Sequence, residues 1–134
     1  LGQKFHQSDR DLVLEFSEIF TPDELFTSLE TVEVFREAGI IIGLDDYGTG
    51  VIRATDIAAF PFDLVKSDRS LCGFEDAWDS PLHAELMQVS KTKPLILVAE
   101  GIEDIDHTSA LLALGYQYVQ GYAFDQPSKL IQRN

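Results

Sequence analysis

Five short apolar runs that alternate with helical patterns predict an α/β fold with a parallel sheet. The runs end at Glu15, Asp45, Lys66, Glu100 and Gln120. Short apolar runs bounded by turn residues are typical of buried parallel strands. Their ends lie about 26 residues apart on average, near the roughly 31 per unit of an eight-stranded barrel of about 250 residues. The sequence therefore predicts a TIM-type (β/α) barrel, of which this chain covers about the C-terminal five βα units.

A doubly wound sheet is the competing architecture. It would gather ligand-binding residues near one switch point of the sheet. Polar residues at all five strand ends fit the barrel better, because those ends converge on one mouth.

The elements follow in order. The polar residues 2–10 are expected to end a helix and its turn, and the first strand occupies residues 11–15. Thr21-Pro22-Asp23-Glu24 has a capping box with proline in the first helical position, so a helix begins there and runs to Ala38. Its buried stripe is predicted at four apolar positions, Leu25, Leu29, Val32 and Phe35. Gly39 ends it.

The second half of the chain repeats this alternation of strands and helices. The remaining strands are predicted at 40–46, 62–66, 95–100 and 116–120. Helices are predicted at 52–60, at 81–91 after Ser80, and at 105–114. Residues 47–50 form a glycine-containing loop, 71–79 a longer connection, and the residues after Gly121 a tail with Pro127.

Composition excludes several classes of protein. The net charge is −13, from 10 Lys and Arg against 23 Asp and Glu. Binding to a DNA or RNA backbone depends on basic residues that neutralise phosphates, so it is not expected. The single Cys72 cannot form an internal disulfide, which suits a reducing cytoplasm. No apolar run approaches the roughly 18 residues that a membrane span needs.

The acids at the strand ends point to a metal. Glu15, Asp45, Asp46, Glu100 and the nearby Glu103 would meet one lysine at the barrel mouth. Acidic sites hold phosphates when divalent cations lie between them. Adjacent aspartates face opposite sides of an extended strand, so the turn that begins there must bring both inward, or one of them has another role.

Five segments in the right order resemble the EAL domain family, bacterial phosphodiesterases and receptors for cyclic di-GMP. The segments begin at Leu14, Leu44, Phe62, Ala99 and Gln120, and read LEFSE, LDDYGTG, FDLVKSDRS, AEGIE and QGY, with Pro127 after the last. The family patterns are E-x-T-E, D-D-F-G-T-G, V-D-x-L-K-I-D-R-S, A-E-G-V-E and Q-G-Y…P. The resemblance covers nearly the whole chain, which is expected to be one partial EAL-type barrel domain over 1–134.

The resemblance implies a catalytic metal site. Glu15, Asp45 and Asp46 would be ligands of one or two Mg²⁺ or Mn²⁺ ions, for which hard oxygen ligands are suited. Glu100 would be a ligand or the general base, and Lys66 would orient the attacking water. The structural alternatives are a turn for the aspartate pair and a salt bridge between Glu100 and Lys66.

Five further positions have implied supporting roles. Gln120 and Thr49 would bind the ligand, although Gln120 could instead cap a loop. Glu18 and Glu103 would support the Asp-Asp loop and a dimer face, and Asp68 would support the site. The expected activity is hydrolysis of cyclic di-GMP to linear pGpG. The alternatives are an inactive cyclic di-GMP receptor, a protein-interaction module, and a scaffold that acts only through dimerisation.

The chain departs from the family mainly by absence. The name-giving E-A-L motif is missing, and so is the upstream Asn ligand, since the only Asn is Asn134. Both are expected to precede Leu1, and the exposed sheet edges demand a missing half or a second chain. Val51-Ile52-Arg53-Ala54 replaces the usual Y-S-S-L. The expected partners are cyclic di-GMP, a second copy of the chain and an upstream sensory or regulatory domain. The expected location is the cytoplasm, with any membrane tether supplied by other domains.

Overall fold

The computed structural model describes residues 3–8, 11–17, 19–121 and 124–129 of the chain. Its strands form one sheet of seven in sequential order. They are β1 (Gln3–Ser8), β2 (Asp11–Phe16), β3 (Ile41–Tyr47), β4 (Leu64–Ser67), β5 (Ile96–Glu100), β6 (Tyr118–Gly121) and β7 (Phe124–Lys129). Strands β2 to β6 pair in parallel, as predicted, whereas β1 and β7 pair antiparallel at the two edges.

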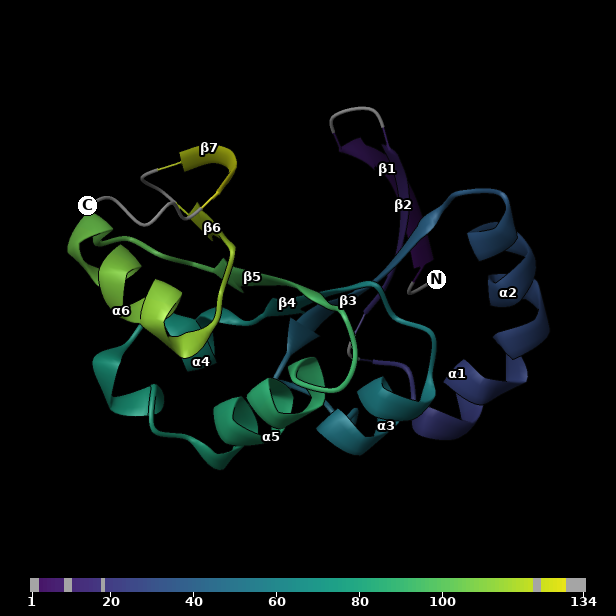
Figure 1. Ribbon diagram of the computed structural model, residues 1–134, viewed down its shortest axis with the longest axis horizontal. Coiled ribbons are helices and arrows are strands. Elements are labelled where there is room, and N and C mark those ends of the chain that lie inside the picture. Colours follow the sequence, from purple (N-terminus) through teal and green to yellow (C-terminus); the bar gives the residue numbers. More distant parts are fainter. Residues whose placement is uncertain (1–2, 9–10, 18, 122–123, 130–134) are drawn as a thin grey trace.

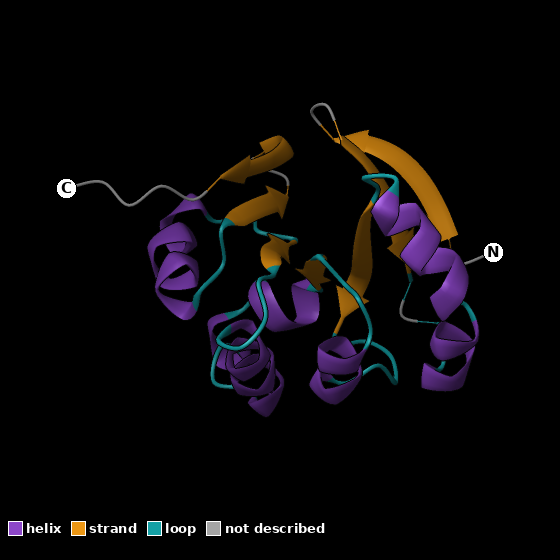
Figure 2. Ribbon diagram, turned by 45° about the vertical axis from the view of Figure 1, so that its right-hand side comes forward, coloured by secondary structure: helices purple, strands orange, loops and turns teal. Residues whose placement is uncertain are grey.

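Helices follow the parallel strands. They are α1 (Pro22–Thr27), α2 (Leu29–Glu37), α3 (Ala54–Ala59), α4 (Arg69–Cys72), α5 (Pro81–Ser90) and α6 (Thr108–Leu114), with 3₁₀ helices η1 (Glu75–Ala77) and η2 (Ile105–His107). Figures 1 and 2 show the helices along one side of a curved sheet. The hairpins β1–β2 and β6–β7 rise at its two ends. The opposite, concave side carries no helix of the described residues.

The predictions for both ends of the chain were wrong. Residues 3–8 form strand β1 rather than the end of a helix, and β7 lies where a tail was expected. Both pair through the backbone with an outer parallel strand: Ser8 lies opposite Asp11, and Lys129 lies opposite Tyr118. An outer strand presents unpaired backbone groups, and each hairpin satisfies one such row.

Two helical predictions also need correction. The helix that begins at Thr21 is divided at Ser28, whose φ of −90° and ψ of 2° end α1, and α2 begins at the next residue. The Ser28 hydroxyl donates to the Leu25 carbonyl and so competes with the helical pattern. The connection predicted at 71–79 contains the end of α4 and all of η1. The capping box of Thr21 and Glu24 is confirmed.

The core lies between the sheet and the helices. Each parallel strand contributes buried residues to it, among them Leu14, Ile42, Val65, Leu97 and Val119. Leu25 and Val32 of the predicted stripe are buried, and Leu29 and Phe35 pack against the core at partial burial. Phe16 meets the rings of Phe60 and Phe62 edge to face.

Two backbone details hold the carboxyl ends of the strands. The Ile102 amide donates to the Gln120 carbonyl at 3.1 Å, which joins the segment after β5 to β6. A Cβ added to Gly121 would lie 2.1 Å from the Ile102 carbonyl oxygen, so only glycine fits there. In the described part of the chain, no helix has the length and apolar character needed to cross a membrane.

Candidate metal centre

The strand-end residues face the concave side of the sheet. Glu15, Asp45, Lys66, Glu100 and Gln120 each come directly after a core residue of the same strand. Successive side chains of a strand point to opposite faces. A polar residue that follows a buried one therefore points away from the helices, and five strands deliver five such side chains to one end of the sheet.

Three carboxylates meet closely enough to share a cation. One oxygen from each of Asp45, Asp46 and Glu100 lies within 4.8 Å of the other two. All three side chains are partly buried. The aspartates stand at the end of β3 and the glutamate at the end of β5, so the group spans β4 between them. Three oxygens at this spacing suit a hard divalent cation.

A bulge lets the adjacent aspartates act together. The pairing of β3 with β4 shifts between Leu44 and Tyr47, so that Asp45 and Asp46 occupy the space of one residue opposite Lys66. Asp46 has a φ of +58°, in the left-handed region that non-glycine residues rarely adopt. This conformation breaks the alternation of the strand. The predicted requirement that the turn bring both aspartates inward is thus met by one strained residue.

The loop that follows holds Asp46 in place. The Thr49 hydroxyl donates to the Asp46 carbonyl at 2.9 Å, and the Thr49 amide reaches the same oxygen at 3.3 Å. The Asp46 amide donates to Asp45 Oδ1 at 3.0 Å. Strain of this kind persists only where the surroundings impose it, and it often marks a functional site. Thr49, predicted to bind ligand, has here a structural contact with the strained residue.

Glu15 is placed differently from the three carboxylates. Its Oε1 lies 2.6 Å from Lys66 Nζ, and the side chains are 2% and 13% exposed. Burial alone would lower the pKa of Lys66. The hydrogen bond and charge of Glu15, with the charges of Asp45 and Glu100, outweigh burial and raise it. The lysine is therefore a fixed positive charge at the site, and Glu15 contacts it rather than joining the other acids.

Glu100 has a strongly raised pKa. Burial, the charge of Asp45 and a hydrogen bond with it, and the charge of Asp46 raise the pKa of Glu100 to about 9, against the opposing effect of Lys66. Its Oε1 is buried without a hydrogen-bond partner among the described residues. A buried carboxylate oxygen of this kind, beside two more acids, fits a cation ligand.

Of the other predicted residues, Gln120 lies beside the group, whereas Asp68 and Glu103 have partners of their own. Gln120 lies opposite Glu100 in the pairing of β5 with β6, and its Oε1 also has no partner within the described chain. Asp68 caps α4 by accepting from the Ser70 amide at 2.9 Å. Glu103 pairs with Arg69 at 3.1 Å, and both are half exposed. Glu18 lies outside the described residues.

A buried polar cluster behind the site was missed from the sequence. His83 of α5 is 2% exposed and hydrogen-bonds the Tyr116 hydroxyl and the Leu71 carbonyl. Helical spacing in the sequence could have indicated that His83 is buried, because it lies three residues before the buried Leu86 on the inner side of α5. A histidine in that position needs buried partners.

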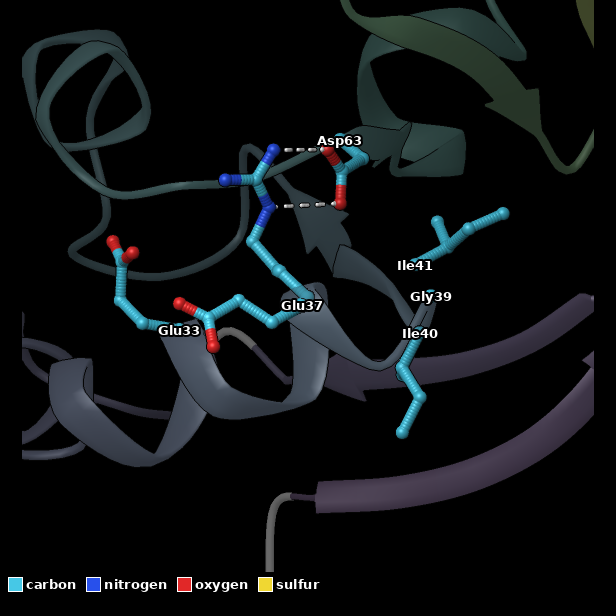
Figure 3. A pocket seen from close by; sticks show the side chains of 7 residues that line it. Glu33, Glu37, Gly39, Ile40, Ile41 and Asp63 are labelled. Carbon is cyan, nitrogen blue, oxygen red and sulfur yellow. Dashed lines mark hydrogen bonds and ion pairs between the residues drawn. The ribbon is translucent and has the colours of Figure 1, made fainter.

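A separate pocket lies at the other end of the strands. It is lined by Glu33, Arg36, Glu37, Gly39, Ile40, Ile41 and Asp63 (Figure 3). Asp63 is already engaged there: it accepts from Arg36 at 2.9 Å and from the Ile42 amide at 3.0 Å. These contacts hold α2 against the starts of β3 and β4. The pocket is thus a structural junction, remote from the carboxylates at the strand ends.

Known proteins match both the sequence and the fold. The EAL domain family matches residues 1–127. The probable cyclic di-GMP phosphodiesterase PdeA of Escherichia coli is 27% identical over 97% of this chain and 18% of its own length. The PaMucR phosphodiesterase, solved as a c-di-GMP complex, is 29% identical with a TM-score of 0.71. The EAL domain of Mycobacterium smegmatis DcpA is 27% identical with a TM-score of 0.73. The chain spans 53% of each of these two solved chains, and each alignment covers 87% of it.

Proposed function

This chain belongs to the EAL domain family, and from that premise we propose that it forms part of the metal-binding catalytic domain of a cyclic di-GMP phosphodiesterase. The proposed reaction is metal-dependent hydrolysis of one phosphodiester bond, which converts cyclic di-GMP to linear pGpG. The names of relatives support the substrate: PdeA is a probable cyclic di-GMP phosphodiesterase, and PaMucR was solved with c-di-GMP.

The group of Asp45, Asp46 and Glu100 is the observation that carries the proposal. Their oxygens lie within 4.8 Å of one another, and Glu100 contributes a buried oxygen without a protein partner in the described residues. These side chains would hold Mg²⁺ or Mn²⁺, with Glu15 as a further ligand once it leaves Lys66. A bound cation of this type lowers the pKa of water and neutralises phosphate charge.

The remaining side chains suit the same reaction. Lys66 offers a partly buried positive charge between the acids, where it would orient the attacking water and offset charge that develops on the phosphate. Glu100 Oε1 can accept the proton of that water. The Gln120 amide lies opposite Glu100 and would hydrogen-bond the ligand, as would Thr49 at the edge of the aspartate loop.

Catalysis would require the rest of the barrel. The chain would be a partial domain over 1–134, and strands that carry the E-A-L Glu and the Asn ligand would close the open sheet. Glu18 and Glu103 would form part of a dimer face. These two residues and Asp68 would also support the aspartate loop.

Two measurements test this proposal on a protein in which this chain is joined to the strands that complete its barrel. Mn²⁺ binding is followed by electron paramagnetic resonance, and conversion of cyclic di-GMP is followed by chromatography. Asp45→Asn is compared with Asp23→Asn, which makes the same chemical change on an exposed residue of α1. The wild type and Asp23→Asn should bind Mn²⁺, and Asp45→Asn should bind it at least tenfold more weakly, the scale of losses at metal sites.

The outcomes separate enzyme from receptor. Linear pGpG formed by the wild type and by Asp23→Asn, but not by Asp45→Asn, supports the enzyme. Binding of cyclic di-GMP that survives a chelator, without turnover, supports a receptor instead. A folded chain that binds neither Mn²⁺ nor cyclic di-GMP overturns both.

A further inference from the structure

A buried polar cluster lies directly behind the acid site, on the helix side of the sheet. Its members are Cys72 at the end of α4, His83 in the first turn of α5, and Tyr116 just before β6. Each side chain is at most 2% exposed. Buried polar groups are costly unless they are satisfied, and a satisfied network fixes the elements that it joins.

The imidazole of His83 bridges two of these elements. Its Nε2 lies 2.8 Å from the Leu71 carbonyl, which can only accept, so Nε2 donates. Its Nδ1 lies 3.1 Å from the Tyr116 hydroxyl, and in the tautomer with the proton on Nε2 it accepts from that hydroxyl. The ring therefore joins α4, which follows β4, to the residue that leads into β6.

The cluster lies next to the site. Burial raises the pKa of the Cys72 thiol, and the nearby charges of Glu100 and Asp68 raise it further. Glu100 is the acid of β5, while β4 supplies Lys66 and β6 supplies Gln120. The contacts of His83 thus join the segment after β4 to the segment before β6, the two strands on either side of the one that carries Glu100.

The same turn of α5 also holds the aspartate loop. The Tyr47 hydroxyl, just after Asp46, donates to the Leu82 carbonyl at 2.9 Å. Arg53, at the start of α3, donates twice to the Glu85 carboxylate, at 2.8 and 2.9 Å. Residues 82, 83 and 85 therefore contact segments attached to β3, β4 and β6.

We propose that His83 is a positioning residue for the acid site: with Tyr116, it fixes the spacing of the strand ends that present Lys66, Glu100 and Gln120. The inference rests on the proposed function, because it assigns a role toward the same cation. Side chains that orient metal ligands from behind commonly change metal affinity about 10- to 100-fold when removed. His83 acts on these side chains only through the segments that it joins, so the lower end of that range is expected.

The test compares three single variants of the chain and the double variant that combines Tyr116→Phe with His83→Gln. Tyr116→Phe removes only a hydroxyl, and His83→Gln removes the bridge. The matched control is Lys93→Met, because Lys93 makes a comparable partly buried tie, to the Ile57 and Phe60 carbonyls, near the start of β5. Amide hydrogen exchange without metal is measured at residues 66, 100 and 120, and Mn²⁺ affinity is measured with each variant folded.

Hydrogen exchange at these three amides should be about fivefold faster in Tyr116→Phe and in His83→Gln, as expected for loss of one buried hydrogen bond. This increase should exceed any increase in Lys93→Met when the variants are compared at equal loss of melting temperature. Mn²⁺ should bind about tenfold more weakly, and the double variant should be no worse than His83→Gln. The inference would be overturned if exchange at residues 66, 100 and 120 changed no more than at other amides of the chain and Mn²⁺ affinity stayed the same. A wild type that binds no Mn²⁺ would overturn the proposed function, and the exchange measurement would still decide the role of His83.

Discussion

Glu15 and Lys66 form a 2.6 Å ion pair across β3, although β2 and β4 are not neighbours in the sheet. Gly43 lies beside Glu15 in the intervening strand, and a Cβ there would come within 3.4 Å of Glu15 Cγ. The missing side chain at Gly43 thus leaves room for Glu15 to lean over β3. The amine of Lys66 therefore lies among the acids of the site and offsets part of their negative charge.

Lys66→Met should lower the free energy of unfolding by about 3 kcal/mol, because it removes the cation that contacts a buried carboxylate. Urea unfolding at neutral pH measures this loss. Glu15→Gln added to Lys66→Met should restore part of the stability. Arg53→Met, which breaks the exposed pair with Glu85, is the control and should change stability little. Equal losses in the two single variants would contradict the prediction.

Without metal, stability should fall as the pH rises from 5 to 9. Burial and the neighbouring aspartates raise the pKa of Glu100 from 4.5 to about 9, so the folded chain retains a proton that the unfolded chain releases in this window. The unfolded state then binds fewer protons, and the free energy of unfolding decreases with pH. Urea unfolding in a chelator at several pH values measures the slope. Glu100→Gln should flatten it, and an unchanged slope in that variant would assign the effect to other groups.

Asp46→Gly should raise stability and weaken metal binding together. Glycine adopts a φ of +58° without strain, which is worth about 1 kcal/mol, but it supplies no carboxylate. Urea unfolding and Mn²⁺ titration of the same sample test both halves. Gain in stability without loss of affinity would remove Asp46 from the ligand set.

Gly121→Ala should be among the most damaging single substitutions in the chain. Its Cβ would overlap backbone atoms of Ile102, which cannot move without breaking the hydrogen bond to Gln120. We expect a loss above about 3 kcal/mol or no folded protein. Gly39→Ala is the control, because Gly39 has a φ of +91° but open space around it, so only conformational strain of about 1 kcal/mol applies. Similar thermal shifts in both variants would contradict the steric argument.

The parallel strands and their polar ends were predictable because burial imposes a simple order on the sequence. A residue that follows a core residue in a strand must face the other side, which is how Lys66 and Glu100 came to be placed together. The fold prediction is confirmed by the solved EAL domains that the chain resembles. The edge strands were not predictable, since the polar residues 3–8 carry no alternating pattern and pair only because β2 offers an open edge.

The proximity of three acids was predictable from the sequence, whereas their role as metal ligands stays a prediction and the predicted ligand Glu15 pairs with Lys66 instead. The sequence brought Asp45, Asp46 and Glu100 to one place, and the structure groups them. The left-handed conformation of Asp46 depends on contacts with Thr49 that no propensity encodes. His83 was overlooked because an apolar helical pattern conceals a polar residue until its partners are known.

The bulge at Asp45 and Asp46 makes the number of residues in this segment important for the site. Because two residues stand opposite one, Leu44 and Tyr47 are both buried on the helix side although three positions separate them. Loss of a single codon here would restore regular alternation and leave Leu44 and Tyr47 on the same buried face, two positions apart, with one carboxylate between them in place of two. The inserted residue thus adds a second carboxylate at the end of β3 while the hydrophobic face behind it keeps its place.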